Sequence, residues 1–596
     1  MKATGMILAL TLGAIAAHAQ SNGSIVLAPS GRLFTVNPDS GSVSVVDTVT
    51  HRKVLERSVG KDPRMLALSP DSRYLYVTSQ GSGTLRAFHL EDLAPAGVIQ
   101  AGAEPYGVVT SPAGDVVYVA ASASAAVEVI RVNDSRHVTR AGDEPAMLQV
   151  TGSIAVEVRP KGLAISPDGS RLYVTHFLSG DISVIDTSSR KVVTVISTGA
   201  DSNMAQRIVL SAATGRAYVP HIRSNVVNPY LLFDGTVFPE LAVIDPVRNV
   251  ELTAERADLS IGAHSVNLPF DAVLSRDGTK AYVVNLGSGE LSVVDLKARY
   301  RIADVDVGDG PRGIALSADG GTAYVTNSLS DDVSVVDLNA LQEITRIKVT
   351  TSPLSATVKR GKLLFYSSRS SQVSRQRWMS CASCHLEGDM DGRTWQLAGI
   401  GPRNTVSLRG ASATGPFHWD ADSCSIQDVA EFTIRDLMGG SGLIAGAANA
   451  PCKGSNVGVS SDLDALAAFC AMLAPKVNPV PQDTAAVARG KAIFNRVDVG
   501  CAVCHVAPLY TDSAMSVKPF IMHNVGTGGG PGEVLGPAFD TPSLLMLWNS
   551  APYLHDGSAA TLMDVLTKRN PLDQHGRTSI LSEADKADLV SFLMSL

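Results

Sequence analysis

Two short stretches carry the residue types with the most evident chemistry, Cys381-Ala-Ser-Cys384-His385 and Cys501-Ala-Val-Cys504-His505. In this spacing two thiols can form thioethers with one porphyrin, and the following histidine can bind its iron. Zinc knuckles and redox-active dithiols are the alternative interpretations. Two copies, each with histidine directly after the second cysteine, favour two covalently bound haem c groups. In these first and second motifs the thioether residues are Cys381, Cys384, Cys501 and Cys504, and the proximal iron ligands are His385 and His505.

The start of the chain has the pattern of a secretory signal peptide over residues 1–20. Lys2 gives the positive start, Met6 to Ala17 the short apolar core, and Ala17-His18-Ala19 the small-residue cleavage site. The alternative is an uncleaved membrane anchor. No later apolar run is long enough to span a bilayer, so we expect no integral membrane segment after signal cleavage. Export fits covalent haem attachment, which takes place outside the bacterial cytoplasm.

Length, charge and cysteine number limit the possibilities further. At 596 residues the chain is too long for one core, which predicts several domains. The net charge of −7 and the absence of a basic tract give no indication of nucleic-acid binding. Three cysteines lie outside the motifs, which predicts one disulfide and one free thiol in an exported protein. Cys470 lies in an apolar helical stretch, where a buried inert thiol is expected, so Cys424 with Cys452 is the preferred pair.

The first 355 residues repeat a phrase of the type Tyr-Val-Thr. Turn signals precede most copies, and an apolar strand ending in aspartate follows most of them. Period-two alternation broken by Gly, Asp and Pro is typical of strands and hairpins. Units of about 40 to 45 residues with four strands each are typical of propeller blades. We therefore predict an all-β, seven-bladed propeller over residues 24–355, in which residues 24–28 complete a blade. The phrase aromatic residues are Phe34, Tyr76, Tyr118, Tyr173, Tyr218, Tyr282 and Tyr324.

The units resemble the YVTN family of β-propeller repeats, which implies the fold and leaves the function open. His176 and His221 follow their phrase tyrosines by three residues in neighbouring repeats, so they are expected at the same end of adjacent blades. The other repeats carry Asn, Ser or Ala there, which favours ordinary strand-end histidines over metal ligands. Insertions near 133–154, 224–240 and 256–266 are either partner-binding loops or simple loop growth.

Beyond residue 357 the pattern becomes helical and the sequence is duplicated. RGKLLF at 360–365 returns as RGKAIF at 489–494, and each copy opens a helix that runs towards a motif. Residues 405–420 align without gaps on residues 541–556, at a constant offset of 136. This duplication indicates two related units, one for each motif.

Further pairs at the same offset extend the duplication. Ser425 and Thr561 are predicted N-caps of equivalent helices. The Pro-rich segment 475–482 separates the two copies. We predict a mainly α part made of two tandem cytochrome c domains, at 357–475 and 483–596, whose haems face each other across a pseudo-twofold axis.

This duplicated part resembles the bacterial di-haem cytochrome c peroxidase superfamily over residues 357–596. That superfamily includes a maturation enzyme that oxidises tryptophans of methylamine dehydrogenase. The resemblance rests on both motifs, on the closing apolar helix, and on GPRNTVSLRG (401–410), FHWDAD (417–422), TPSLL (541–545) and APYLHDGSAATL (551–562).

The resemblance implies roles for individual residues. Trp419 matches an aromatic residue that lies between the haems and assists electron transfer. Asn404, together with carbonyl groups near 540–542, matches part of a calcium site between the two halves. His555 matches a histidine near the second haem that does not bind iron.

The sequence departs from the classical peroxidases in two places. They carry a displaceable histidine between the first motif and the W-D motif, whereas none lies here between His385 and His418. They also carry a catalytic glutamate before a Met-Gly pair, whereas Leu437 precedes Met438 here, which leaves Asp436 as the candidate acid. Proton transfer by such a group contributes about 10²- to 10⁴-fold. Peroxide reduction is therefore expected to be slow here, or to use another carboxylate.

The offset of 136 also suggests the sixth iron ligands. It places Met438 and Gly439 over Gln574 and His575, which makes Met438 the candidate for the first haem and His575 for the second. Core packing of Met438 and a surface position of His575 are the alternatives. Thioether ligation raises the reduction potential, so the two haems would hold different potentials. Rival ligands for the second haem are Met515, Met522, His523 and Met546.

Three functional hypotheses follow. The chain is an enzyme that reduces hydrogen peroxide or oxidises a partner protein, or an electron carrier whose propeller docks partners, or a propeller sensor with a cytochrome reporter. The resemblance of the whole duplicated part favours the enzyme, and the missing distal residues favour the carrier. We expect a periplasmic protein of a Gram-negative bacterium, with a donor or acceptor cytochrome or a cupredoxin as redox partner.

Overall fold

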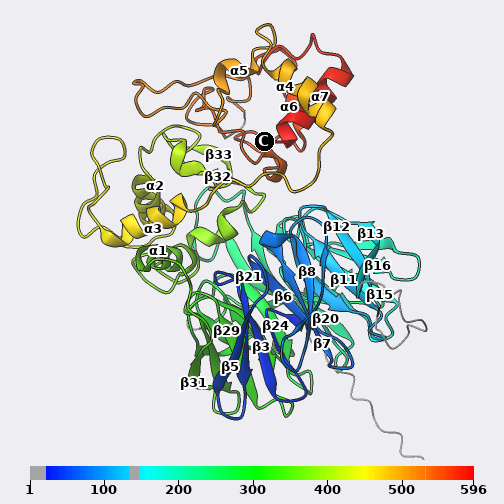
Figure 1. Cartoon of the computed structure of the whole chain (residues 1–596). Helices are drawn as coiled ribbons and strands as arrows, with labels where there is room; N and C mark the ends of the chain where they lie inside the picture. The colour runs from blue at the N-terminus through cyan, green and yellow to red at the C-terminus, as the bar shows by residue number, and fades with distance from the viewer. Residues whose placement is uncertain (1–21, 134–146, 263, 531) are drawn as a thin grey trace, which may run out of the picture.

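The computed structural model describes residues 22–133, 147–262, 264–530 and 532–596. The expected signal peptide and part of the first insertion lie outside the described residues. Figure 1 shows a ring of β-blades with a smaller part of helices and loops on one face of the ring. In the described part of the chain, every helix is too short or too polar to cross a bilayer.

The ring is a propeller of seven blades, as predicted, and each phrase aromatic residue lies in the second strand of its blade. A two-residue strand, β1 (Asn22–Gly23), pairs with the inner strand of blade 2. From the inner to the outer strand, the first three blades are β2–β5 (Ile25–Leu27, Arg32–Asn37, Ser42–Asp47, Arg52–Ser58), β6–β9 (Pro63–Leu68, Tyr74–Ser79, Thr84–His89, Pro95–Gln100) and β10–β13 (Pro105–Thr110, Val116–Ala121, Ala126–Val132, Leu148–Ala155).

Blade 5 is the irregular one, because its inner and outer strands are both split into two short pieces. Its outer piece β23 pairs with β27 and so joins the sheets of blades 5 and 6. Two 3₁₀ turns, η1 (Gln80–Ser82) and η3 (Thr253–Glu255), connect strands. The remaining blades are β14–β17 (Pro160–Ile165, Arg171–His176, Ile182–Asp186, Lys191–Ile196), β18–β23 (Ser202–Asn203, Val209–Ser211, Arg216–Ser224, Val237–Asp245, Val250–Glu251, Ala257–Asp258), β24–β27 (Pro269–Leu274, Lys280–Asn285, Glu290–Asp295, Tyr300–Asp306) and β28–β31 (Pro311–Leu316, Thr322–Asn327, Asp332–Asp337, Gln342–Lys348).

Apolar side chains fill each interface between neighbouring blades. Seven clusters of buried residues lie one at each interface, which is why the phrase strands are buried on both faces. The last of these joins Ile25 and Leu33 of blade 1 to Tyr324 and Val333 of blade 7. The ring is therefore closed by hydrophobic packing, and burial of these side chains is the dominant stabilising contribution.

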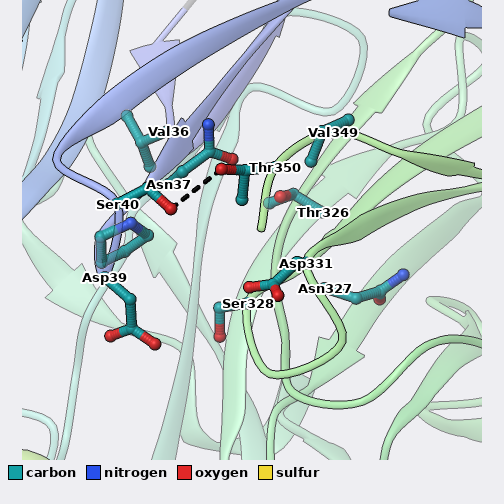
Figure 2. A pocket seen from close by; sticks show the side chains of 11 residues that line it. Val36, Asn37, Asp39, Ser40, Thr326, Asn327, Ser328, Asp331, Val349 and Thr350 are labelled. Carbon is teal, nitrogen blue, oxygen red and sulfur yellow. Dashed lines mark hydrogen bonds between the residues drawn. The ribbon is translucent and has the colours of Figure 1, made fainter. Parts of the chain in front are cut away.

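A pocket lies at the junction of blades 7 and 1, where Ser40 and Thr350 hydrogen-bond across it at 2.9 Å (Figure 2). Its two carboxylates are already paired with lysines of the helical part: Asp39 with Lys362 at 2.6 Å, and Asp331 with Lys359 at 2.6 Å. At this pocket the propeller therefore binds the helical part of the chain, and both carboxylates of the pocket take part in that contact.

The rest of the chain forms a first helical unit (357–475) and a second helical unit (483–596). Alongside the α-helices they contain short turns and one two-stranded sheet. The first unit has α1 (Ala356–Tyr366), η4 (Cys381–Ser383), η5 (Leu386–Gly388), β32 (Thr394–Leu397), β33 (Gly401–Asn404), η6 (Ala411–Ala413), α2 (Ile426–Phe432), the π-helical turn η7 (Thr433–Leu437) and α3 (Ser461–Ala471); the second has α4 (Thr484–Phe494), α5 (Cys501–Cys504), η8 (Leu547–Asn549), α6 (Leu562–Leu566) and α7 (Glu583–Met594).

The two units repeat the same helix packing. A Cβ added at Gly361 of α1 would lie 1.8 Å from the Ala465 carbonyl oxygen of α3, so only glycine permits this approach. Likewise, a Cβ added at Gly490 of α4 would lie 1.9 Å from the Asp588 carbonyl oxygen of α7. An aromatic pair stands beside each contact, with ring centroids 5.1 Å apart in the first unit and 5.2 Å in the second. The repeated RGK…F pattern therefore specifies one helix pair in each unit.

The predicted helix caps and the predicted disulfide of the helical units are confirmed, whereas the predicted helix content is too high. Ser425 and Thr561 accept hydrogen bonds from the backbone N–H groups of Asp428 and Asp564, so both predicted N-caps are confirmed. The Cys424–Cys452 disulfide is present, and Cys470 is a buried free thiol. The expectation of a mainly α part is too strong, because long loops separate short helices.

The propeller packs much more closely on the first unit than on the second. One apolar cluster joins propeller residues such as Phe177 and Phe270 to Phe365 and Trp378 of the first unit. The core cluster of the second unit is drawn from residues 487–596 alone. The insertion at 224–240 lengthens the β20–β21 hairpin, and the carbonyls of its tip accept hydrogen bonds from Gln396 and Ala398 at 2.9 and 2.8 Å. That insertion therefore serves to dock the first unit.

Glu104 ties the propeller to the segment between the units, and this tie predicts acid sensitivity. Its buried carboxylate pairs with Lys476 at 2.7 Å and Arg159 at 3.0 Å. Burial alone would raise the pKa of Glu104, but the two cations lower it to about 2. Because the folded pKa lies below the unfolded one, the stabilisation is complete above about pH 4.5 and is lost as pH falls towards 2. The full effect is about 3 kcal/mol.

We expect the unfolding temperature of the wild type to fall more steeply between pH 5 and pH 2.5 than that of the Glu104→Gln variant. Asp462→Asn is the matched control, because its exposed pair with Arg360 contributes at most about 1 kcal/mol. Equal pH slopes for the wild type and Glu104→Gln would contradict the assignment.

Candidate functional site

The first motif forms a 3₁₀ turn enclosed between the first unit and the propeller. Cys381 and Cys384 are free thiols that pack against the apolar cluster shared by both parts. Burial raises the pKa of Cys381 to about 12 and lowers that of His385 to about 4, so the imidazole is neutral. The buried Nδ1 of His385 has no hydrogen-bond partner among the described residues. A neutral imidazole carries a lone pair that can bind a metal.

The propeller itself covers the first motif. Ser383, the residue directly before the second cysteine, is only 8% exposed and donates to Asn267 Oδ1 at 2.9 Å. The same Asn267 donates through Nδ2 to Ser380 Oγ at 3.1 Å. One propeller asparagine thus accepts one hydrogen bond and donates another, and together they fix the turn that holds the thiols.

The second motif is built differently and is open to solvent. Its cysteines lie on α5, which begins after Gly500 in a left-handed conformation (φ 85°). Val503, the counterpart of Ser383, is 70% exposed. His505 Nδ1 lies 3.0 Å from the Tyr510 carbonyl, so this nitrogen donates and the opposite nitrogen is left to bind a metal.

His575 faces His505. Their ring centroids lie 6.2 Å apart with an interplanar angle of 39°. With metal–nitrogen bonds of about 2 Å and ring nitrogens about 1 Å from the ring centre, one metal between two imidazoles separates their centroids by about 6 Å. Burial beside His505 lowers the pKa of His575 to about 4, so the His575 imidazole is neutral. Asn570 fixes the loop, since it accepts from the His575 N–H at 2.8 Å. The pair therefore fits an iron held from both sides.

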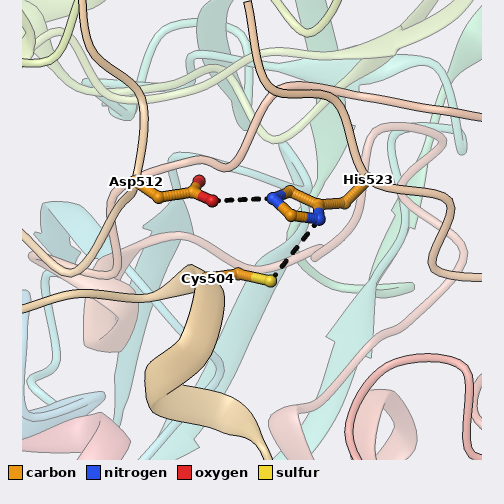
Figure 3. Close-up of side chains that lie close together, drawn as sticks. All are labelled: Cys504, Asp512 and His523. Atoms are coloured by element: carbon orange, nitrogen blue, oxygen red, sulfur yellow. Dashed lines mark hydrogen bonds and ion pairs between the residues drawn. The ribbon is translucent and has the colours of Figure 1, made fainter. Parts of the chain in front are cut away.

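A rival side chain lies on another flank of the second motif (Figure 3). His523 Nδ1 is 3.5 Å from Cys504 Sγ, and its Nε2 is 2.7 Å from Asp512. These three residues form the one group of potential metal-binding side chains found in the described parts of the chain. Because Cys504 is the thioether position, His523 lies beside the expected porphyrin attachment and is already bound to Asp512.

The other proposed ligands and acids are placed as follows. Met438 is 1% exposed and belongs to the apolar cluster that contains the first motif. Asp436, the candidate acid, is exposed on η7. Met546 is buried within the second unit, whereas Met515 is exposed and Met522 is half-buried. The catalytic role of Asp436 and the ligand role of Met438 stay predictions.

Trp419 connects the two units. Its indole N–H donates to the Asn404 carbonyl at 3.2 Å in the first unit, and its carbonyl accepts from the Asp540 N–H at 2.9 Å in the second. Its ring meets His555 edge to face at 6.2 Å, and His555 stacks on Phe539 at 3.9 Å. This aromatic series runs from one unit into the other.

One unpaired oxygen atom and one buried carboxyl group, on residues hydrogen-bonded to Trp419, are of the types that the calcium site implied by the resemblance would need. Asn404 Oδ1 is buried and has no hydrogen-bond partner among the described residues. Burial raises the pKa of Asp540 to about 6, and the hydroxyl of Ser513 donates to this carboxyl at 2.6 Å. Oxygen donors of these types are what Ca²⁺ binds.

His176 and His221, the two histidines singled out in the propeller sequence, are buried, and neither ring nitrogen of His221 has a hydrogen-bond partner among the described residues. His176 and His221 lie on β15 and β20, and burial lowers their pKa values to about 4 and about 3. His176 Nε2 lies 2.8 Å from Ser183 Oγ. Sequence reasoning missed Glu387 and Asn570, which hold the two histidine-bearing loops. Glu387 had one signal, its position two residues after His385, and Asn570 had none.

Two models of known protein families match parts of this chain. The family model described as a seven-bladed β-propeller lactonase matches residues 137–373, and that of the cytochrome d1 haem domain matches residues 9–208. Both matches fall largely on the propeller, and neither covers half of the chain.

Three curated relatives match about two fifths of the chain. Hydrazine synthase subunit gamma of Kuenenia stuttgartiensis is 30% identical over 42% of this chain and 80% of its own length. The methylamine utilization protein MauG of Methylorubrum extorquens is 31% identical over 40% of this chain and 77% of its own. MauG of Methylophilus methylotrophus is 27% identical over 40% and 81%. The chain therefore belongs to the family that includes hydrazine synthase subunit gamma and MauG.

Proposed function

We propose that this chain is an exported two-haem c-type cytochrome of the di-haem peroxidase type, coupled to peroxide reduction or to oxidation of a partner protein. The observation that carries the proposal is the 6.2 Å pairing of His505 with His575 behind one of two Cys-x-x-Cys-His motifs. Bound haem would supply one-electron chemistry at each site. Cys381 and Cys384 would hold the first haem, and Cys501 and Cys504 the second.

The protein residues divide the work between the two sites. His505 and His575 would hold the second iron from both sides, an arrangement suited to storing and passing electrons. His385 would hold the first iron, with Met438, which lies in the apolar cluster that contains the first motif, as the candidate for its other side. Trp419 would couple the sites, and Asn404 with Asp540 would hold a calcium ion that fixes the units on either side of it.

The cellular location and the redox partner are also part of the proposal. We propose a periplasmic location in a Gram-negative bacterium and a cytochrome or cupredoxin as redox partner. Such a partner would exchange electrons at the second motif, because Val503 leaves that motif exposed while Ser383 of the first is covered. Electron transfer without catalysis is the second candidate, supported by the exposed position of Asp436 and the burial of Met438 against the first motif.

An optical and EPR titration of the purified protein with hydrogen peroxide separates the two candidates. The enzyme predicts one high-spin haem whose signal disappears when peroxide is added. Two low-spin haems that do not respond to peroxide would contradict the enzyme and support the electron carrier.

A further inference from the structure

Glu387 extends from the first motif into the mouth of the propeller channel. It lies two residues after His385, on the turn η5. The N–H of the next residue, Gly388, donates back to the His385 carbonyl at 2.9 Å. Any force on the Glu387 side chain therefore acts on the backbone that carries His385.

Three cations from different blades surround this carboxylate. Arg64, Lys161 and Arg312 each occupy the second position of an inner strand, β6, β14 and β28, directly after the proline that opens it. Tyr106 and Phe270 occupy the same position in blades 3 and 6. We call the three cations the axial ring. The Pro-x start shared by five of the seven inner strands thus places three cations and two aromatic rings around the channel.

The contacts within this group are short and sheltered. Arg64 and Arg312 both donate to Glu387 Oε1, the latter at 2.9 Å. Their side chains are each 10% exposed and that of Glu387 is 13% exposed. The Lys161 ammonium lies 3.9 Å from the centre of the Tyr106 ring, and the Arg312 guanidinium 5.1 Å from that of Phe270.

The backbone at Glu387 is held against its preference. Its φ is 61°, a left-handed conformation that a residue with a Cβ adopts only when its surroundings enforce it. The first unit grips the same residue from the other side, since Arg409 donates to the Glu387 carbonyl at 2.7 Å. Glycine would adopt this conformation without strain, but it has no carboxylate for the axial ring to bind.

The second motif lacks this arrangement. Ala507 follows His505 at the position of Glu387, and it is exposed. One chain therefore contains two motifs of the same type, of which one is clamped by the propeller and the other is free. The second serves as an internal reference for the first.

We propose that Glu387 and the axial ring form an electrostatic clamp through which the propeller orients His385 and sets the reduction potential of the first haem alone. The proposal rests on the proposed function, because it requires haem at both motifs. Glu387 is a positioning residue, since it acts through the backbone of His385 and through the balance of charge near the iron.

The test is a spectroscopic redox titration of the holoprotein and its variants. Glu387→Gln removes one negative charge beside the axial ring and leaves the Arg64–Asp62 pair (2.7 Å) in place, so the first haem should become easier to reduce. Arg312→Gln removes a cation, so the first haem should become harder to reduce. One unit charge about 10 Å away changes the ferric-to-ferrous ratio at fixed potential roughly tenfold. The second haem should not respond, and Arg312→Lys should restore most of the wild-type value because it keeps the charge.

Lys362→Met is the matched control, because it breaks another ion pair between propeller and first unit, with Asp39. It should leave both potentials unchanged. Shifts of the same sign in Glu387→Gln and Arg312→Gln, or equal shifts at both haems, would overturn the clamp and indicate simple loosening of the interface. A wild-type protein without haem would instead contradict the proposed function.

Discussion

Replacing His575 with glycine is expected to convert the second haem from a low-spin to a high-spin spectrum. The reason is the 6.2 Å separation of the His505 and His575 rings, which leaves room for one iron with a nitrogen on each side. The His575→Met variant should keep six ligands and raise the second potential by on the order of 100 mV, because axial ligands set haem potentials over a wide range. The measurement is EPR and optical redox titration of both variants.

The matched control is His523→Asn, which alters the other histidine beside the second motif. It removes the 2.7 Å contact with Asp512 and is expected to leave the low-spin signal in place. A high-spin second haem in His523→Asn, together with an unchanged spectrum in His575→Gly, would mean that His523 is the ligand.

Replacing both cysteines of one motif with serine is expected to remove half of the covalent haem. Serine cannot form the thioether, so each motif should lose its own haem and leave the other attached. The two double variants should differ in stability. The first motif is part of the apolar cluster shared with the propeller, whereas the second belongs to a core formed by residues 487–596 alone. The Cys381/Cys384 variant should therefore unfold at a much lower temperature than the Cys501/Cys504 variant.

Haem stain after denaturing electrophoresis, with iron analysis, measures the outcome. Cys470→Ala is the control, because this buried thiol of α3 lies outside both motifs. It should retain all covalent haem. Loss of haem in Cys470→Ala, or full retention in either double variant, would contradict the assignment of the motifs.

Much of the fold could be predicted, because it repeats locally. The phrase tyrosines mark the second strand of every blade, since both faces of that strand are buried between blades. The constant offset of 136 predicted the caps Ser425 and Thr561, because N-cap chemistry depends on residues only three positions apart. The Cys424–Cys452 bond followed from the apolar setting of Cys470.

What could not be predicted depends on contacts between distant parts of the chain. Glu387 meets Arg64 across 323 residues, and no periodic pattern relates a haem motif to a propeller strand. The contact between Trp419 and His555 was not predicted, because edge-to-face contact between units leaves no mark on sequence spacing. The family resemblance implied a place for each residue but no contact between them. The insertion at 224–240 was visible as extra length, but its role needed the hydrogen bonds to β32.

Two covalent haems in one exported chain are the central claim, and the intact mass of the mature protein tests it most directly. The account predicts a mass above that of the processed polypeptide by two haem groups, with two iron atoms per chain. A mass without haem, or with a single group, would contradict it, as would zinc in place of iron.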